Sequence, residues 1–397
     1  MSTDPGSVVV VGAGALGLCT AWQLIESGVT NVTVIERGRI AGASSGLSVG
    51  IVETQYLDPV AIAVRVESMR SFASLERTGV LEIVRNGYLR LGHRDEDMEA
   101  FARSVAIQRE LGVADSRVVE ADELRRLVPD LRVDDLAGGL FGQSDGYLDG
   151  HGFCDALAAA VRNGGGRVLQ DTELLGCDPA PGDRHRLTTS HGTLDCDVVV
   201  NAAGGWAGRV GEILGAPIEI LPQRHQALMG RLPVPLAYAM PSIMDYVPSS
   251  GGFGVYIRDD GPGRFIAGLH TEEVIHDIVD PDDHGRNAPD EYVTLVGERL
   301  AHRLPGLGEM RLGDVWAGIY PMRPDGRPVV GPHPGRPSVV TVAGGGGSGL
   351  QSSPALGRIA AEWILDGRPV TIPAAVVFRP SSEQVVPSSS DATTSRA

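Results

Sequence analysis

Residues 7–28, SVVVVGAGALGLCTAWQLIESG, decide the fold of this chain. The valine run at 8–11 predicts a buried strand, and the apolar residues after the glycines predict a helix that ends near Ser27. A G-x-G-x-x-G turn stands between them, formed by Gly12, Gly14 and Gly17. Glycines at this spacing allow a sharp turn, close approach of the backbone to a pyrophosphate, and close packing of helix on strand. Since the helix N-terminus also presents free N–H groups to phosphates, we predict a dinucleotide-binding turn.

A second strand, NVTVIE at residues 31–36, follows the helix and ends in Glu36. An acid at this distance from the glycines binds a ribose hydroxyl in dinucleotide-binding folds. The acid disfavours a 2′-phosphate and therefore NADP. FAD and NAD are both compatible with this unit alone.

Nucleotide-binding patterns recur along the chain. Small residues follow the second strand directly, at 39–52, where backbone must pass close to a ligand. CDVVVNAAGGWAG, 196–208, is an apolar strand that ends in small residues, and residues 339–365 repeat strand, glycine turn and helix. Strand-like segments such as 253–259 and 263–271 lie between them. We therefore predict an α/β fold, with a mainly antiparallel β-sheet domain inserted into a Rossmann-like dinucleotide-binding domain.

The two predicted domains are discontinuous in sequence. Residues 1–85, 145–215 and 318–378 are expected to form the Rossmann-like domain, and residues 86–144 and 216–317 the substrate-binding domain. The tail, residues 380–397, is rich in Ser, Thr and Pro and is expected to be disordered.

Composition disfavours several kinds of partner. The net charge of -16 argues against nucleic acid, because phosphate binding requires a basic face. No stretch reaches the ~20 apolar residues of a membrane span, and no basic segment precedes the first apolar run as it does in a signal peptide. The four cysteines are scattered without metal-ligand spacing. We therefore expect a cytoplasmic protein with reduced cysteines and no metal site.

Five further motifs occur in a characteristic order. They are GASSG at 42–46, DGYLDGHGF at 145–153, VVNAAGGWAG at 199–208, WAGIYPMRPDGRPVVG at 316–331 and AGGGGSGLQSSPALG at 343–357. Together with the glycine turn and Glu36, they resemble the D-amino-acid oxidase superfamily of flavoproteins. Within it, the chain is similar to the sarcosine oxidase, dimethylglycine dehydrogenase and glycine oxidase group. The resemblance covers about residues 6–378.

The resemblance implies an FAD-dependent oxidoreductase that acts on a small amine or amino acid. Members of the family bind FAD in an extended form and remove a hydride equivalent from the carbon next to an amine, giving an imine that water hydrolyses. Some members pass the electrons to oxygen and others to a carrier protein. Two alternatives stay open: a dehydrogenase that serves as the flavin subunit of a heteromeric complex, and a flavin-binding redox module without amine chemistry.

The resemblance also implies which residues contact FAD. They are Gly12, Gly14, Gly17, Glu36, Arg37, Ala43, Ser44, Ser45, Ala203, Gly204, Trp206, Gly318, Gly346, Gly347, Ser348, Gly349 and Leu350. Monomeric sarcosine oxidases attach FAD through a cysteine at the position of Gly318, so we expect non-covalent FAD here. The oxygen-activating lysine of those oxidases matches Ile266, and this chain has no lysine. Oxygen is then activated in another way, or the natural acceptor is not oxygen.

Five residues match positions at the substrate pocket of the family: Tyr256, His270, Tyr320, Glu53 and Gln351. Tyr256 and His270 match side chains that line the cavity over the flavin. The other three stand where related oxidases have cations that bind a substrate carboxylate. A buried carboxylate without a cation or several donors is costly. Either another arginine replaces the missing cations, namely Arg258, Arg323, Arg224 or Arg65, or the substrate has no carboxylate near the reacting carbon.

Two of these positions carry a more detailed expectation. Glu53, if it faces the pocket, suits a second cationic group on the substrate, as in a diamine or a basic amino acid. Otherwise the match to the family is shifted by one residue at this position, or Glu53 faces solvent. Arg323 adjoins the turn 324–326 and stands three residues after Tyr320, so on a strand it points to the opposite face. We expect Arg323 at the shoulder of the turn and only secondarily as a carboxylate anchor.

Overall fold

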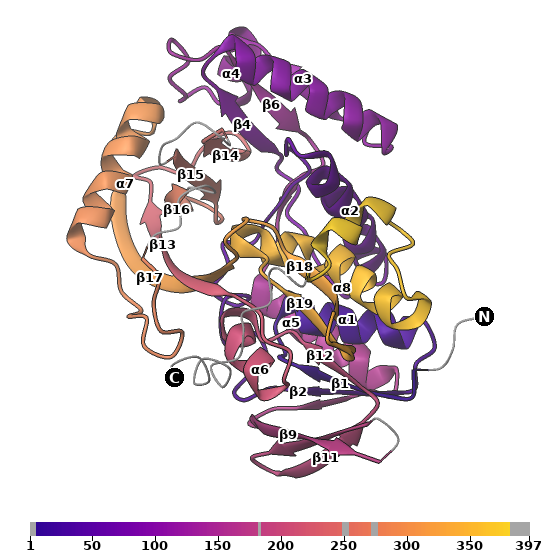
Figure 1. The fold of residues 1–397 in the computed structure, drawn as a ribbon. Helices are drawn as coiled ribbons and strands as arrows, with labels where there is room; N and C mark the ends of the chain where they lie inside the picture. The colour runs from indigo at the N-terminus through magenta and orange to yellow at the C-terminus, as the bar shows by residue number, and fades with distance from the viewer. Residues whose placement is uncertain (1–4, 182–183, 248–253, 271–276, 382–397) are drawn as a thin grey trace, which may run out of the picture.

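The computed structural model describes residues 5–181, 184–247, 254–270 and 277–381. Two large sheets dominate the fold. A six-stranded sheet lies in the lower half of Figure 1, and an eight-stranded sheet curves along the left and the top of the same view. Residues 382–397, most of the tail that we expect to be disordered, lie outside the described residues.

The six-stranded sheet has the order β18-β19-β12-β1-β2-β8. All neighbouring strands are parallel except β18 and β19, which are antiparallel. Strands from the start, the middle and the end of the chain therefore meet in one sheet, as predicted. The strands are β1 (Ser7–Val11), β2 (Asn31–Ile35), β8 (Arg167–Leu169), β12 (Val198–Asn201), β18 (Val329–His333) and β19 (Arg336–Ala343).

Strand β1 is buried on both faces. Val8 and Val10 pack into a core with helices α1 (Ala15–Glu26), α5 (Gly150–Asn163) and α8 (Gly349–Asp366). Val9 and Val11 face a second core, to which α6 (Ala207–Ile213) and a small sheet contribute. This sheet contains β9 (Leu174–Ala180), β10 (Arg184–Thr189) and β11 (Gly192–Cys196). An unbroken apolar run is typical of a strand covered on both sides.

The eight-stranded sheet has the order β17-β13-β16-β15-β14-β4-β6-β5. All its neighbours are antiparallel except β4 and β14, which confirms a mainly antiparallel second sheet. The strand that comes last in the sequence, β17, extends past residue 317 and so runs from one predicted domain into the other. The strands are β4 (Tyr88–Gly92), β5 (Ser116–Val119), β6 (Gly138–Gly142), β13 (Leu221–Arg231), β14 (Ser242–Asp245), β15 (Gly254–Asp259), β16 (Arg264–His270) and β17 (Arg311–Met322).

The remaining elements surround the two sheets. Helices α3 and α4 lie at the upper end of the eight-stranded sheet, α7 lies at its left, and α2 lies beside α8 (Figure 1). Among the residues that the structure describes, no helix combines the length and the apolar composition that a membrane span requires. The elements are α2 (Pro59–Arg77), α3 (Asp95–Glu110), α4 (Ala121–Leu127), α7 (Asp290–Arg303), and the strand pair β3 (Ile51–Val52) and β7 (Gly146–Tyr147).

The four cysteines are packing residues, as the sequence predicts. All are free, and Cys19, Cys154 and Cys196 are fully buried. Burial raises the pKa of the Cys154 thiol to about 12. Cys19 lies where α1 and α8 pack closely, since a Cβ on Gly357 would be 2.7 Å from the Cys19 backbone.

Candidate active site

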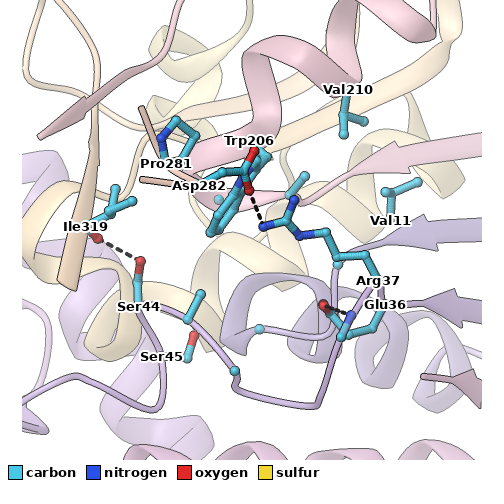
Figure 2. Close-up of a pocket in the computed structure, with 18 of the residues that line it drawn as sticks. Val11, Glu36, Arg37, Ser44, Ser45, Trp206, Val210, Pro281, Asp282 and Ile319 are labelled. Carbon is cyan, nitrogen blue, oxygen red and sulfur yellow. Dashed lines mark hydrogen bonds and ion pairs between the residues drawn. The ribbon is translucent and has the colours of Figure 1, made fainter. Parts of the chain in front are cut away.

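Three adjoining cavities lie between the two sheets. The largest, of about 640 Å³, opens beyond the carboxyl ends of β1, β2 and β12 (Figure 2). A second, of about 130 Å³, shares the wall formed by Gly14, Ser44 and Ser45 with the first. A third, of about 100 Å³, shares Tyr256 and Tyr320 with the second. The three cavities therefore follow one another in a path from the glycine turn to the eight-stranded sheet.

The three glycines of the first turn have different roles. Gly12 has a φ of 111°, and a Cβ there would lie 2.5 Å from the carbonyl oxygen of Ala202. A Cβ on Gly17 would lie 2.0 Å from the carbonyl oxygen of Gly12. Gly14 has an ordinary φ of -82°, and its Cβ would meet only the Ser45 hydroxyl, at 3.1 Å. Gly12 and Gly17 are therefore required by the packing of the chain, whereas Gly14 leaves room in the cavity wall.

Glu36 lies at the end of β2 and lines the largest cavity. Its Oε2 accepts a hydrogen bond from the Ala13 N–H at 2.9 Å, and its Oε1 accepts one from the Gly38 N–H at 2.8 Å. These bonds fix the carboxylate beside the glycine turn. Each oxygen has a further lone pair, so the carboxylate can still accept from ribose hydroxyls.

A cluster of charged side chains, which we call the Asp282 cluster, lies at the rim of the largest cavity (Figure 2). Asp282 forms ion pairs with Arg37 at 2.7 Å and with Arg209 at 2.5 Å, and accepts from Trp206 Nε1 at 2.9 Å. The Arg37 guanidinium lies 4.2 Å from the centre of the Trp206 ring. The cluster joins the end of β2 to α6 and to segment 280–286. Sequence reasoning identified Arg37 and Trp206 but not Asp282, which belongs to no motif.

The predicted FAD residues lie along the first two cavities, with two exceptions. Ser348 lines only the smallest cavity, and Gly17 lines none because it packs α1 against the turn. Ser44 donates a hydrogen bond to the Ile319 carbonyl at 2.6 Å, which ties the GASSG segment to β17. Gly318 lines the middle cavity and has no side chain through which a flavin can be attached.

The structure brings all five predicted substrate residues together. Glu53, Tyr256, His270, Tyr320 and Gln351 line the smallest cavity. They come from the end of β3, from β15, β16 and β17, and from the first turn of α8. Their separation along the chain is large, so only the fold of the two sheets makes them neighbours.

Aromatic contacts fix the rings on the side of this cavity that the eight-stranded sheet forms. Tyr256 is 4% exposed, and burial raises the pKa of its phenol well above the usual value, so the group stays a neutral hydrogen-bond donor. Tyr320 stacks on His225 with ring centres 3.7 Å apart. His270 makes an edge contact with Tyr246, with ring centres 5.3 Å apart. These contacts fix the rings that face the cavity.

Glu53 is buried and does not face solvent. Its Oε1 pairs with Arg65 Nε at 3.2 Å, and its backbone N–H donates to Gln351 Oε1 at 3.1 Å. Asp145 lies nearby and accepts from the Thr54 N–H at 3.1 Å. Burial, and next the negative charge of Glu53, raise the pKa of the Asp145 carboxyl well above its usual range.

Arg90 is a cavity residue that sequence reasoning missed. It lies on β4, is 2% exposed, and is the one arginine among the described residues that line the smallest cavity. Its Nε donates to the Gln55 carbonyl at 3.0 Å and its Nη1 to the Tyr246 carbonyl at 3.1 Å. An arginine inside the strand YLRLG gives no local signal, because alternation does not tell which face of a strand is inward.

The four arginines considered from sequence lie outside this cavity wall. Arg65 pairs with Glu53, Arg224 with Asp277, Arg258 with Asp260 and Arg323 with Asp325. Arg323 does adjoin the turn, but it is 4% exposed and so is not a surface residue. Its side chain packs on Gly344, where a Cβ would lie 3.0 Å from Arg323 Cγ.

Three comparisons with known proteins agree with this geometry. A family model described as FAD dependent oxidoreductase (DAO) matches residues 7–363. The chain is 26% identical to glycine oxidase of Geobacillus kaustophilus over 366 residues, which cover 90% of this chain and 92% of the relative. It is 26% identical to human mitochondrial sarcosine dehydrogenase over 373 residues, covering 91% of this chain but 40% of the relative.

A solved structure shows the same fold. L-proline dehydrogenase from P. horikoshii superposes with a TM-score of 0.83 and 25% identity, covering 93% of this chain and 95% of the other. Human sarcosine dehydrogenase, in contrast, is much longer than this chain, which spans about two fifths of its length.

Proposed function

Since this chain belongs to the DAO family of FAD-dependent oxidoreductases, we propose that it oxidises a C–N bond of a small amine or amino acid. The observation that supports this most directly is the position of the smallest cavity. It adjoins the nucleotide path and is lined by Tyr256, His270 and Arg90, which can bind and orient a small polar molecule. A volume of about 100 Å³ is far below the ~300–1,000 Å³ of pockets for drug-sized ligands, so the substrate is small.

The first two cavities fit an extended dinucleotide. Gly14 leaves an open wall at the N-terminus of α1, where backbone N–H groups can bind a pyrophosphate. Glu36 would accept from ribose hydroxyls, and the Asp282 cluster would cover the outer end. Gly318, Gly346 and Gly347 would border the flavin ring in the middle cavity, without a covalent bond. When bound, FAD supplies the hydride acceptor of the reaction.

The protein contributes binding and orientation. Related oxidases bind the substrate carboxylate through cations at the positions of Tyr320, Glu53 and Gln351. We propose that Arg90 takes over this role in the present chain. Its guanidinium is already held by two carbonyls, so little side-chain entropy remains to be lost on binding. Tyr256 would donate a second hydrogen bond. Held at both points, the substrate presents the C–H bond next to nitrogen to the flavin ring.

A second candidate function differs in the electron acceptor. Ile266, at the position of the oxygen-activating lysine in related oxidases, is 6% exposed and lies opposite Met229 on β13. No lysine exists elsewhere in the chain to replace it. This observation favours a dehydrogenase that passes electrons to a carrier protein or partner subunit over an oxidase that uses oxygen.

An anaerobic substrate panel tests the proposal. The purified protein is mixed without oxygen with glycine, N-methylglycine, proline and simple alkylamines, and bleaching of the flavin absorbance is followed. Reduction by at least one amine is expected. If no amine or amino acid reduces the flavin, the proposed function is wrong. Admission of air then separates the two acceptors, since rapid reoxidation with peroxide release indicates an oxidase and slow reoxidation a dehydrogenase.

A further inference from the structure

Segment 277–286, which we call the strap, forms one wall of the largest cavity. Both of its ends are fixed to the eight-stranded sheet. At the first end, the Arg224 N–H of β13 donates to the Asp277 carbonyl at 3.0 Å, and Arg224 Nε pairs with the Asp277 carboxylate at 2.8 Å. At the other end, the Ala317 N–H of β17 donates to the Arg286 carbonyl at 2.9 Å. The strap is therefore a loop that is held at both ends.

A tight turn at residues 280–283 forms the tip of the strap. The Asp283 N–H donates to the Asp280 carbonyl at 3.0 Å, and Asp280 Oδ1 accepts from the Asp282 N–H at 2.8 Å. Aspartate in the first position and proline in the second favour such a turn, because the carboxylate bonds to the backbone two residues on and proline fixes φ. The sequence DPDD therefore presents Asp282 at the tip of the strap.

The Asp282 cluster ties this tip to elements of the six-stranded sheet. Arg37 follows β2, whereas Trp206 and Arg209 follow β12, and all three bind the Asp282 carboxylate. Figure 2 shows Arg37 and Trp206 beside Asp282. The hydrogen bond from Arg37 lowers the pKa of the Asp282 carboxyl, so the group stays ionised at neutral pH. The strap thus joins the two sheets at the outer end of the largest cavity.

The ties at the tip are weaker than those at the ends. The side chains of Arg37, Arg209 and Asp282 are 42%, 49% and 45% exposed, and exposed ion pairs contribute little and are screened by salt. Asp277 has a φ of 47° and Gly285 a φ of 62°, so the backbone turns sharply near both ends. A few such loop residues can absorb the rotation of a moving segment. The tip can therefore separate from the arginines while the ends stay attached.

We propose that the strap retains bound FAD, and that the Asp282 cluster is the latch that opens before FAD is released. This inference rests on the proposed position of FAD, whose adenosine would lie beside Glu36 at the same end of the cavity. A ligand that fills this cavity touches both the strap and the end of β2. Opening the latch removes one wall of its site. Asp282 is then a positioning residue, which acts through Arg37, Trp206 and the strap.

The rate of FAD release tests the latch. Protein loaded with isotopically labelled FAD is mixed with excess unlabelled FAD, and the label that stays bound is counted over time. Asp282→Asn keeps the size of the side chain but removes its charge. We expect this variant to release FAD on the order of 10-fold faster than wild type, as for the loss of two exposed ion pairs. An unchanged release rate would overturn the proposal.

Salt dependence separates a latch from a general loss of stability. In wild type the release rate should rise about threefold or more between about 0.05 M and about 0.5 M NaCl, because salt screens exposed ion pairs. The rise should be much smaller in Asp282→Asn. Asp195→Asn is the matched control, since it removes an exposed pair with Arg186 in the small sheet, outside the three cavities. This control should behave as wild type, and equal salt dependence in all three proteins contradicts the latch.

ADP locates the effect along the path. Since ADP occupies only the adenosine end, Asp282→Asn should release labelled ADP faster by a similar factor. Faster release of FAD with an unchanged rate for ADP would place the effect at the flavin end and contradict the assignment.

The anaerobic substrate panel distinguishes this inference from the proposed function, because reduction of the flavin by an amine depends on the smallest cavity and not on the latch. An unchanged release rate in Asp282→Asn overturns the latch and leaves amine oxidation standing. Conversely, if no amine reduces the flavin but the variant releases FAD faster, amine oxidation fails and the latch stands.

Discussion

Two kinds of glycine stand in the first turn, and a substitution should distinguish them. Gly14 has a backbone that any residue can adopt and meets only the Ser45 hydroxyl. Gly14→Val should therefore leave the fold intact and abolish FAD binding, because the side chain would occupy the pyrophosphate position. Gly17→Ala places a methyl group 2.0 Å from the Gly12 carbonyl oxygen and should cost about 2 kcal/mol or more of folding free energy.

Flavin content after purification and the thermal unfolding midpoint measure these two effects. The Gly14 variant should be colourless with a midpoint close to that of the wild-type apoprotein. The Gly17 variant should unfold at a lower temperature whether or not FAD is added. A yellow Gly14→Val protein with unchanged FAD affinity would show that the pyrophosphate does not pass this residue.

Arg90 offers a prediction about the substrate carboxylate. Arg90→Gln keeps a donor near the Gln55 and Tyr246 carbonyls but removes the charge. We expect the apparent Kd of an amino acid in anaerobic flavin reduction to rise on the order of 100-fold, as for loss of a charged hydrogen-bond pair. Reduction by an alkylamine without a carboxylate serves as the control and should be nearly unchanged. A similar rise in the apparent Kd for both substrates would mean that Arg90 stabilises the fold and does not bind the carboxylate.

At the scale of elements, an ion-pair network joins β4 and β14, which are parallel neighbours in the eight-stranded sheet. His93, just after β4, bonds to Asp245 Oδ1 at 2.7 Å, while Arg303 binds Asp245 Oδ2 and also Asp135. The hydrogen bond to Asp245 raises the pKa of His93. A raised histidine pKa stabilises the fold at pH values below ~6.5, and the gain is lost as pH rises through the folded-state pKa.

The measurement compares wild type with His93→Gln between pH 5.5 and 8.5. Because the His93 side chain is 38% exposed, solvent screening limits the expected advantage of wild type to about 0.5 kcal/mol at pH 5.5. The advantage should vanish by about pH 8.5. An advantage that grows with pH would mean that histidine is not protonated in this network.

The elements with a strong local pattern are those that the sequence predicts. The valine run, the glycine turn and Glu36 form β1, α1 and β2 almost residue for residue, because β1 pairs with β2 and packs on α1 within one continuous segment. Register against the family motifs likewise brings Tyr256 and Tyr320 to one cavity. In the first case short-range sequence suffices, whereas Tyr256 and Tyr320 are predicted by the resemblance to the family and become neighbours only through the folded sheet.

Arg90 and Asp282 could not be predicted in the same way. Arg90 lies in the cavity wall because β4 pairs with β14, which places Met244 opposite it from a distant part of the chain. Asp282 meets Arg37 and Trp206 only after the eight-stranded sheet returns segment 280–286 to the nucleotide cavity. Glu53 was predicted as a pocket residue, but its partner Arg65 became evident only from the position of α2.

At the scale of the whole molecule, the cavities draw their walls from both sheets. Gly12 and Ala202 directly follow β1 and β12 of the six-stranded sheet, whereas Gly318 and Ile319 belong to β17 of the eight-stranded sheet. A ligand that fills this path therefore binds only when both sheets are folded and in place. FAD should stabilise the protein as one unit and not one sheet alone.

Thermal unfolding of the apoprotein with added FAD tests this linkage. At a free FAD concentration of about 1,000 times Kd the expected stabilisation is about 4 kcal/mol, which for a chain of this length is a rise in midpoint of about 5 °C. ADP reaches only the end of the path near Glu36 and Trp206, so its saturating effect should be smaller. The Gly14→Val variant should show no rise with either ligand. The contrary result is an unchanged midpoint at saturating FAD, or two separate unfolding transitions of which FAD raises the midpoint of only one. Either result would mean that FAD does not bind across both sheets.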